Sequence, residues 1–97
     1  MKYYKSKRSS RRHIEYIREL DSQPEAFKGS KLMYVHKILI ERLRGGHYEV
    51  QNVSYLTDKE TFELNAKYAW VETTEEEFNE TWKKVEYLER EFDKILE

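Results

Sequence analysis

An amphipathic stripe in the last quarter of the chain constrains its fold most strongly. Apolar side chains recur there every three or four residues, at Phe78, Trp82, Val85, Leu88, Phe92 and Leu96. This spacing predicts a helix from residue 74 to the C-terminus with one buried face. Thr74 and Glu77 form a capping-box pattern at its start, and Glu75 and Glu76 lie at the positive end of the helix dipole. We expect this helix to cover a sheet.

Residues 61–71 show the alternation that is typical of a strand with one buried face. The apolar positions are Phe62, Leu64, Ala66, Tyr68 and Trp70. We expect residues 47–56 to form the antiparallel neighbour of this strand, joined to it through residues 57–60. Two strands alone make a marginal sheet, so a third strand is needed.

The segment from residue 31 to residue 44 fits two structures. A helix would turn Leu32, Val35, Leu39 and Leu43 inward, whereas its tyrosine, valine and isoleucines favour a strand. Periodicity alone does not decide between them.

Gly45 and Gly46 favour the strand, because they suit a two-residue hairpin turn. Such a turn would pair Arg42 with Glu49 and Ile38 with Val53. The alternative takes Gly45 as the C-terminal stop of a helix.

A first helix is expected from about residue 11 to residue 22, with Ser9 or Ser10 as its cap and Ile14, Ile17 and Leu20 at three-residue spacing. Residues 23–30 form a connection with room for one helical turn. The predicted fold is α+β, in the order helix, three-stranded antiparallel sheet, helix, with both helices on one face. The alternative order is two helices, hairpin, helix. Residues 11–97 would form a single domain.

Charge is polarised along the chain. The first thirteen residues carry six of the 18 lysines and arginines and no acid, which leaves 12 cations against all 19 Asp and Glu in the remainder. Like charges in a row repel, so residues 1–10 are expected to form a flexible basic arm. Such asymmetry indicates a tail that binds phosphate groups, attached to a body that does not bind them.

Nucleic acid is therefore an expected partner. Tyrosines beside the cations could stack on unpaired bases, so RNA is as plausible a ligand as duplex DNA. The alternative is a tail that only aids solubility. The candidate binding residues are Lys5, Lys7, Arg8, Arg11, Arg12, Arg18 and Tyr16.

Catalytic chemistry is not apparent in the sequence. His13, His36 and His47 lack a second histidine or a carboxylate at metal-ligand spacing, and no nucleophile motif or phosphate-binding glycine motif occurs. We expect no enzyme, no metal and no cofactor. The chain has no cysteine and no apolar run long enough to span a membrane, so a cytoplasmic location is expected.

Three segments resemble type II-A anti-CRISPR proteins, which are small phage-encoded inhibitors of the RNA-guided type II CRISPR nuclease. They are KSKRSSRRHIEYIREL at residues 5–20, GGHYEVQNVS at residues 45–54, and the strand and helix from Phe62 onward. The resemblance implies an inhibitor that acts in the bacterial cytosol on the nuclease or its guide RNA.

Two routes of inhibition are implied. The basic arm would grip guide RNA and hinder its loading, or an acidic surface of the last helix, with Glu76, Glu80, Glu86 and Asp93, would occupy a nucleic-acid site on the nuclease. We favour the arm, because bases among the helical acids dilute any imitation of phosphates. The competing classes are a small nucleic-acid-binding phage regulator, with Arg11, Arg12 and Arg18 on a recognition helix, and an adaptor that binds through Tyr87.

Overall fold

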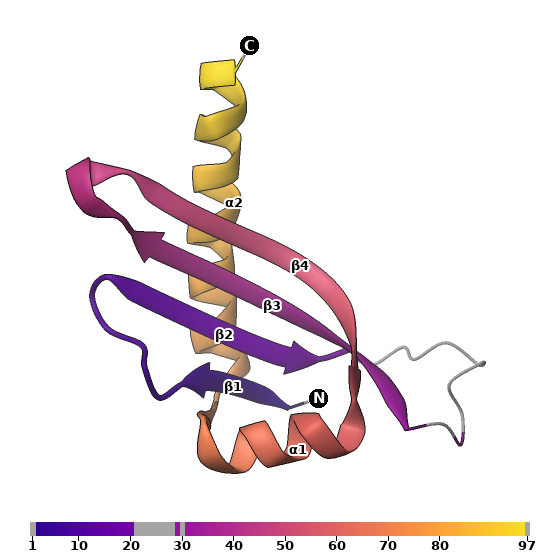
Figure 1. Cartoon of the computed structure of the whole chain (residues 1–97). Coiled ribbons are helices and arrows are strands. Elements are labelled where there is room, and N and C mark those ends of the chain that lie inside the picture. The colour runs from indigo at the N-terminus through magenta and orange to yellow at the C-terminus, as the bar shows by residue number, and fades with distance from the viewer. Residues whose placement is uncertain (1, 21–28, 30, 97) are drawn as a thin grey trace.

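The computed structural model describes residues 2–20, 29 and 31–96, with residues 92–96 described by their backbone only. Five strands, two α-helices and one 3-10 turn follow one another in a single α+β domain (Figure 1). In chain order they are β1 (Tyr3–Ser6), β2 (His13–Glu19), β3 (Leu32–Arg42), η2 (Arg44–Gly46), β4 (Tyr48–Asp58), α1 (Lys59–Tyr68), β5 (Trp70–Thr73) and α2 (Glu75–Leu96).

All five strands belong to one antiparallel sheet with the order β4-β3-β2-β1-β5. The prediction of three strands is therefore wrong, although the α+β class is confirmed. The first four strands form a meander, and α1 then carries the chain from the β4 edge to the β5 edge (Figure 1). Ten helical residues rise about 15 Å, and four strand spacings measure roughly 19 Å, so α1 spans most of this crossing.

The N-terminal residues form an inner strand of the sheet. Tyr3 pairs with Arg18 of β2 on one side and with Thr73 of β5 on the other. The flexible arm that was expected at residues 1–10 is thus absent from residues 2–10: β1 occupies part of that segment, and backbone hydrogen bonds hold the residues that follow. The driving force is burial, because Tyr3 packs on Phe78 with ring centroids 5.4 Å apart.

The helix expected from residue 11 is also wrong, since His13–Glu19 is strand β2. Neighbouring side chains on this strand are buried on opposite faces of the sheet: Tyr16 is 3% exposed and Ile17 is 2% exposed. A helix would not bury adjacent residues on opposite sides, and β-branched and aromatic residues suit a central strand. The connection expected at residues 23–30 lies largely outside the described residues.

Strand β3 and its hairpin confirm the strand interpretation of residues 31–44, but the pairing differs from the predicted one by one residue. Arg42 pairs with Tyr48, and Ile38 pairs with Asn52. The turn contains three residues, Arg44–Gly46, rather than two. A shift of one residue changes which side chains of β4 share the face of Ile38, which α2 covers, so Val53 lies on the opposite face.

The strand predicted at residues 61–71 is mostly helix α1. Asp58 caps this helix by accepting a hydrogen bond from the Thr61 backbone N–H at 3.1 Å. Phe62 is its one buried residue, whereas Leu64 and Tyr68, which were expected on the buried face, are 57% and 65% exposed. Only the end of the predicted segment, from Trp70, is a strand.

The C-terminal helix is confirmed as α2. Its Phe78 and Val85 are completely buried, and Trp82 and Leu88 pack around them. Phe92 and Leu96, which complete the predicted stripe, have side chains outside the described part. The capping interaction is observed in part, because the Thr74 hydroxyl accepts from the Glu77 N–H at 3.2 Å.

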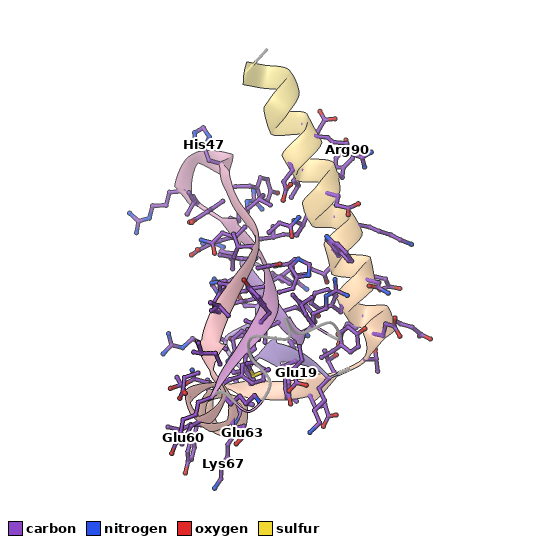
Figure 2. All side chains as sticks on the ribbon, turned by 90° about the vertical axis from the view of Figure 1, so that its right-hand side faces the viewer. Glu19, His47, Glu60, Glu63, Lys67 and Arg90 are labelled. Atoms are coloured by element: carbon purple, nitrogen blue, oxygen red, sulfur yellow. The ribbon has the colours of Figure 1, made fainter. Side chains whose placement is uncertain are left out.

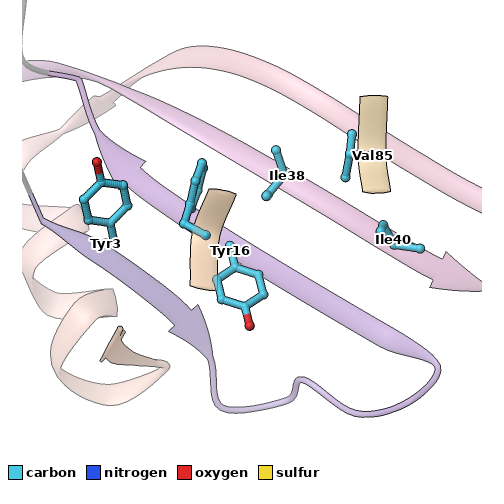
Figure 3. Packing of buried hydrophobic residues seen from close by; sticks show 6 residues of the cluster. Tyr3, Tyr16, Ile38, Ile40 and Val85 are labelled. Carbon is cyan, nitrogen blue, oxygen red and sulfur yellow. The ribbon is translucent and has the colours of Figure 1, made fainter. Parts of the chain in front are cut away.

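The two helices pack on opposite faces of the sheet, not on one face as expected. Helix α2 lies behind the sheet in Figure 1 and beside it in the turned view of Figure 2. It covers the larger cluster of buried residues, part of which is drawn in Figure 3: Tyr3, Tyr16, Ile38, Ile40, Phe78 and Val85. Helix α1 covers a second cluster, on the other face, with Ile17, Met33, Val35 and Phe62. No helix in the described residues is long and apolar enough to cross a membrane.

A polar group centred on the buried His36 lies under α2. The Arg18 guanidinium stacks on the Trp82 ring at 4.7 Å and donates from Nε to Nδ1 of His36 at 3.0 Å. The other ring nitrogen of His36 therefore carries a proton and donates to Asn52 Oδ1 at 2.6 Å. Burial lowers the pKa of His36 below 6.5, with a smaller effect in the same direction from Arg18, whereas the Asn52 hydrogen bond acts in the opposite direction.

Replacing Phe78 with alanine should lower the free energy of unfolding by about 3–5 kcal/mol, because it leaves a cavity at the centre of the larger cluster. Leu64→Ala, at an exposed position of α1, should change it by less than about 0.5 kcal/mol. Urea unfolding followed by circular dichroism measures both values. Equal effects of the two substitutions would show that the assignment of the buried faces is wrong.

Stability should fall as the pH is lowered through about 6.5. Below that pH residue 36 is protonated in the unfolded chain, whereas His36 of the folded protein stays neutral because its pKa is lower. The stability that neutral His36 contributes is therefore present above pH 6.5 and is lost as the pH falls to the pKa of the folded state. Urea unfolding midpoints at pH values between about 7.5 and 5.5 measure this loss. His36→Gln should have a flatter profile, and an identical slope in both proteins would contradict the assignment to His36.

Candidate nucleic-acid interface

The loop between β1 and β2, residues 7–12, is held at both of its ends. The Lys7 N–H donates to the carbonyl of Ala69 at 3.0 Å, and the Arg12 carbonyl accepts from the N–H of Arg42 at 2.7 Å. Between these points Ser10 N–H donates to the His13 carbonyl at 2.7 Å. The cations of this loop are therefore presented from a defined backbone next to the β3–β4 hairpin.

The tip of that hairpin carries two further arginines, Arg42 at the end of β3 and Arg44 in the turn. Gly45 and Gly46 have φ values of +84° and +83°, a region that glycine adopts without steric cost. The Leu43 N–H closes the turn on the His47 carbonyl at 2.7 Å. Arg12, Arg42 and Arg44 line a depression of about 340 Å³ beside the glycines.

Helix α2 adds Lys83 and Lys84 to the same region. Lys84 and Arg11 line a second depression, of about 370 Å³, between the loop and the helix. This depression also contains Glu77 and Glu80, and Lys5 lies 3.6 Å from Glu77. The second depression is thus of mixed charge, unlike the depression at the hairpin turn.

We call the exposed cations of these three elements the basic end: Arg11, Arg12, Arg42, Arg44, Lys83 and Lys84. Within the described residues none of the six forms an ion pair with a carboxylate. Unpaired, solvated guanidinium groups are available for bidentate hydrogen bonds to phosphate.

Acids and lysines occur together at the other end of the long axis. Figure 2 shows Glu19, Glu60 and Glu63 near α1, far from His47 at the tip of the hairpin. Figure 2 labels Lys67 in the same region, and Lys31 and Lys59 also lie at or beside α1, so this end carries both signs of charge. A polyanion would be attracted to the hairpin end rather than to an end of mixed charge.

The seven expected binding residues are distributed over different environments. Lys7, Arg8, Arg11 and Arg12 are exposed in the loop, and Lys5 is partly buried. Tyr16 is 3% exposed beneath α2, so its ring has no open face on which a base could stack. Arg18 is half-buried and belongs to the polar group around His36.

The phenol of Tyr16 is a structural group in this arrangement. Burial raises its pKa, and the charge of Glu77 raises it further, so the hydroxyl stays protonated at neutral pH. Glu77 has the opposite shift. A hydrogen bond from Thr73 lowers its pKa most, and Lys5 contributes in the same direction.

Sequence reasoning missed Arg42, Arg44, Lys83 and Lys84 as members of a common surface. The pattern RLRGG at residues 42–46 was the available indication, because cations beside a glycine turn are placed at a hairpin tip. Only the pairing of β2 with β3 brings that tip next to the N-terminal loop.

The histidines are less isolated than the sequence suggested. His13 lies 3.0 Å from a Glu15 oxygen and 3.7 Å from a Glu41 oxygen across β2 and β3. Even so, in the part of the chain that the structure describes, no group of three or more His, Asp and Glu side chains is arranged to hold a metal ion.

Comparisons with known proteins add no assignment: no family model, no curated protein and no solved structure matches this chain.

Proposed function

We propose that this protein binds the phosphate backbone of a nucleic acid through its basic end. The observation that carries this proposal is the set of Arg12, Arg42 and Arg44 around the hairpin turn, with no acidic partner among the described residues. Three arginines within one depression supply charge and paired donors in the geometry that suits phosphate oxygens. A surface of this kind binds with an affinity that falls steeply with salt.

The biological role that we propose is inhibition of an RNA-guided type II CRISPR nuclease by competition for its guide RNA. The resemblance to type II-A anti-CRISPR proteins and the basic end both support it. The binding surface is then the folded loop and hairpin rather than a flexible arm. Such an inhibitor would act without catalysis in the bacterial cytosol.

The alternative of a phage regulator has less support. Its recognition helix was expected to present Arg11, Arg12 and Arg18. The first two lie in a loop and Arg18 lies on strand β2 under α2, so these residues offer no helix for a major groove.

Replacing Arg12, Arg42 and Arg44 with glutamine should weaken RNA binding and reduce the dependence of log K on log salt by roughly 2 to 3, since each phosphate contact contributes about 0.7 to 0.9. Fluorescence anisotropy with labelled RNA between about 50 and 200 mM salt measures both quantities. A matched control removes three exposed lysines near α1: Lys31→Gln, Lys59→Gln and Lys67→Gln. Equal loss in the two triple variants would refute a localised site.

The inhibitory role has its own test, in which target DNA cleavage by a type II nuclease is measured with the protein added before or after the guide RNA. Inhibition only on early addition is the expected result. Inhibition in both orders would indicate a later step, and no inhibition of several such nucleases would contradict this role while leaving RNA binding intact.

A further inference from the structure

A mostly apolar groove of about 450 Å³ lies between α2 and the strands at the basic end of the molecule. Ile14 of β2, Ile40 of β3 and Leu88 of α2 line it. Ile14 and Ile40 are direct partners across the two strands, so they form a continuous apolar surface. The volume is within the range of about 300–1,000 Å³ that small-ligand sites occupy.

Two tyrosines border this groove from different elements. Tyr48 comes from β4 and is 41% exposed, and Tyr87 comes from α2 and is 57% exposed. Both rings therefore have accessible surface, in contrast to Tyr16 in the core. An aromatic side chain that is open to solvent is the usual platform on which an unpaired base stacks.

Cations lie along the same groove. Arg11, Lys83 and Lys84 line it together with the tyrosines, and none of its lining residues in the described part of the chain is a carboxylate. Arg12, the next residue after Arg11, lines the arginine depression at the hairpin turn. Arg42 of that depression also pairs directly with Tyr48 of the groove, so the apolar groove adjoins the proposed phosphate-binding surface.

We propose that this groove receives an unpaired nucleobase, which makes the protein selective for single-stranded nucleic acid. The inference rests on the proposed function, because the arginines bind the backbone whose base enters the groove. Charge selects the ligand: the charged residues that line this apolar groove, among those described, are all cations, so it complements a nucleotide, whose flat apolar base is attached to an anionic phosphate. Duplexes keep their bases stacked, so they contact the arginines alone.

The test compares anisotropy titrations of oligouridine and oligothymidine of about 12 nucleotides with those of duplex RNA and duplex DNA. The test variant combines Tyr48→Thr with Tyr87→Ala. Single-strand binding should weaken about tenfold or more, whereas duplex binding should stay unchanged. The RNA and DNA probes show which sugar is preferred, and selectivity for either single strand supports the groove.

Control variants separate stacking from folding. Tyr48→Phe and Tyr87→Phe keep the rings and should bind as the wild type does. Tyr68→Ala removes a more exposed tyrosine from α1 and should have no effect. Tyr87→Ala alone, at an exposed helical position, keeps the inference testable if the double variant does not fold.

If the tyrosine variant weakened single-strand and duplex binding equally, or changed neither, the groove would not be a base-binding site. The proposed function would then still be decided by the variant that replaces the three arginines. If the wild-type protein bound none of the four probes, both the groove inference and the proposed function would be wrong. The two ideas therefore fail in different ways.

Discussion

The aromatic contacts of Phe78 hold this structure together. Its ring is completely buried and meets Tyr3 of β1 at 5.4 Å, Tyr16 of β2 at 6.3 Å and His36 of β3 at 5.6 Å. A single residue of α2 therefore touches three adjacent strands. Because tilted and edge-to-face ring pairs are favourable at these separations, this contact places the helix on the sheet and the N-terminal strand within it.

The position of β1 determines what kind of binding surface the protein has. A free basic tail would lose conformational entropy on binding, whereas a loop tied to Ala69 and Arg42 has already lost much of that freedom during folding. The same loop brings Arg11 toward α2 and Arg12 toward the hairpin turn. Preorganisation thus joins cations from three parts of the sequence into one surface.

Some features could be predicted from local pattern. The stripe around Phe78 and Val85 specified α2, and the β-branched and aromatic content of residues 31–44 with the following glycines indicated a hairpin. The strand expected at residues 61–71 failed because the pattern was ambiguous: Phe62 and Ala66 alternate with polar residues, but they are also four positions apart, as on a helix face. The Asp58 cap and the crossing between sheet edges favour the helix.

The sequence by itself determined the amphipathic helix α2, the positive φ at the hairpin turn and the overall charge asymmetry, because these depend on neighbouring residues or on composition. Only the tertiary structure decided that the basic N-terminal segment pairs between β2 and β5, that Tyr16 is buried, and that Arg12 lies beside Arg42 and Arg44. These outcomes depend on contacts between residues distant in sequence. Such contacts form only when burial on both faces of the sheet outweighs the local preferences of each segment.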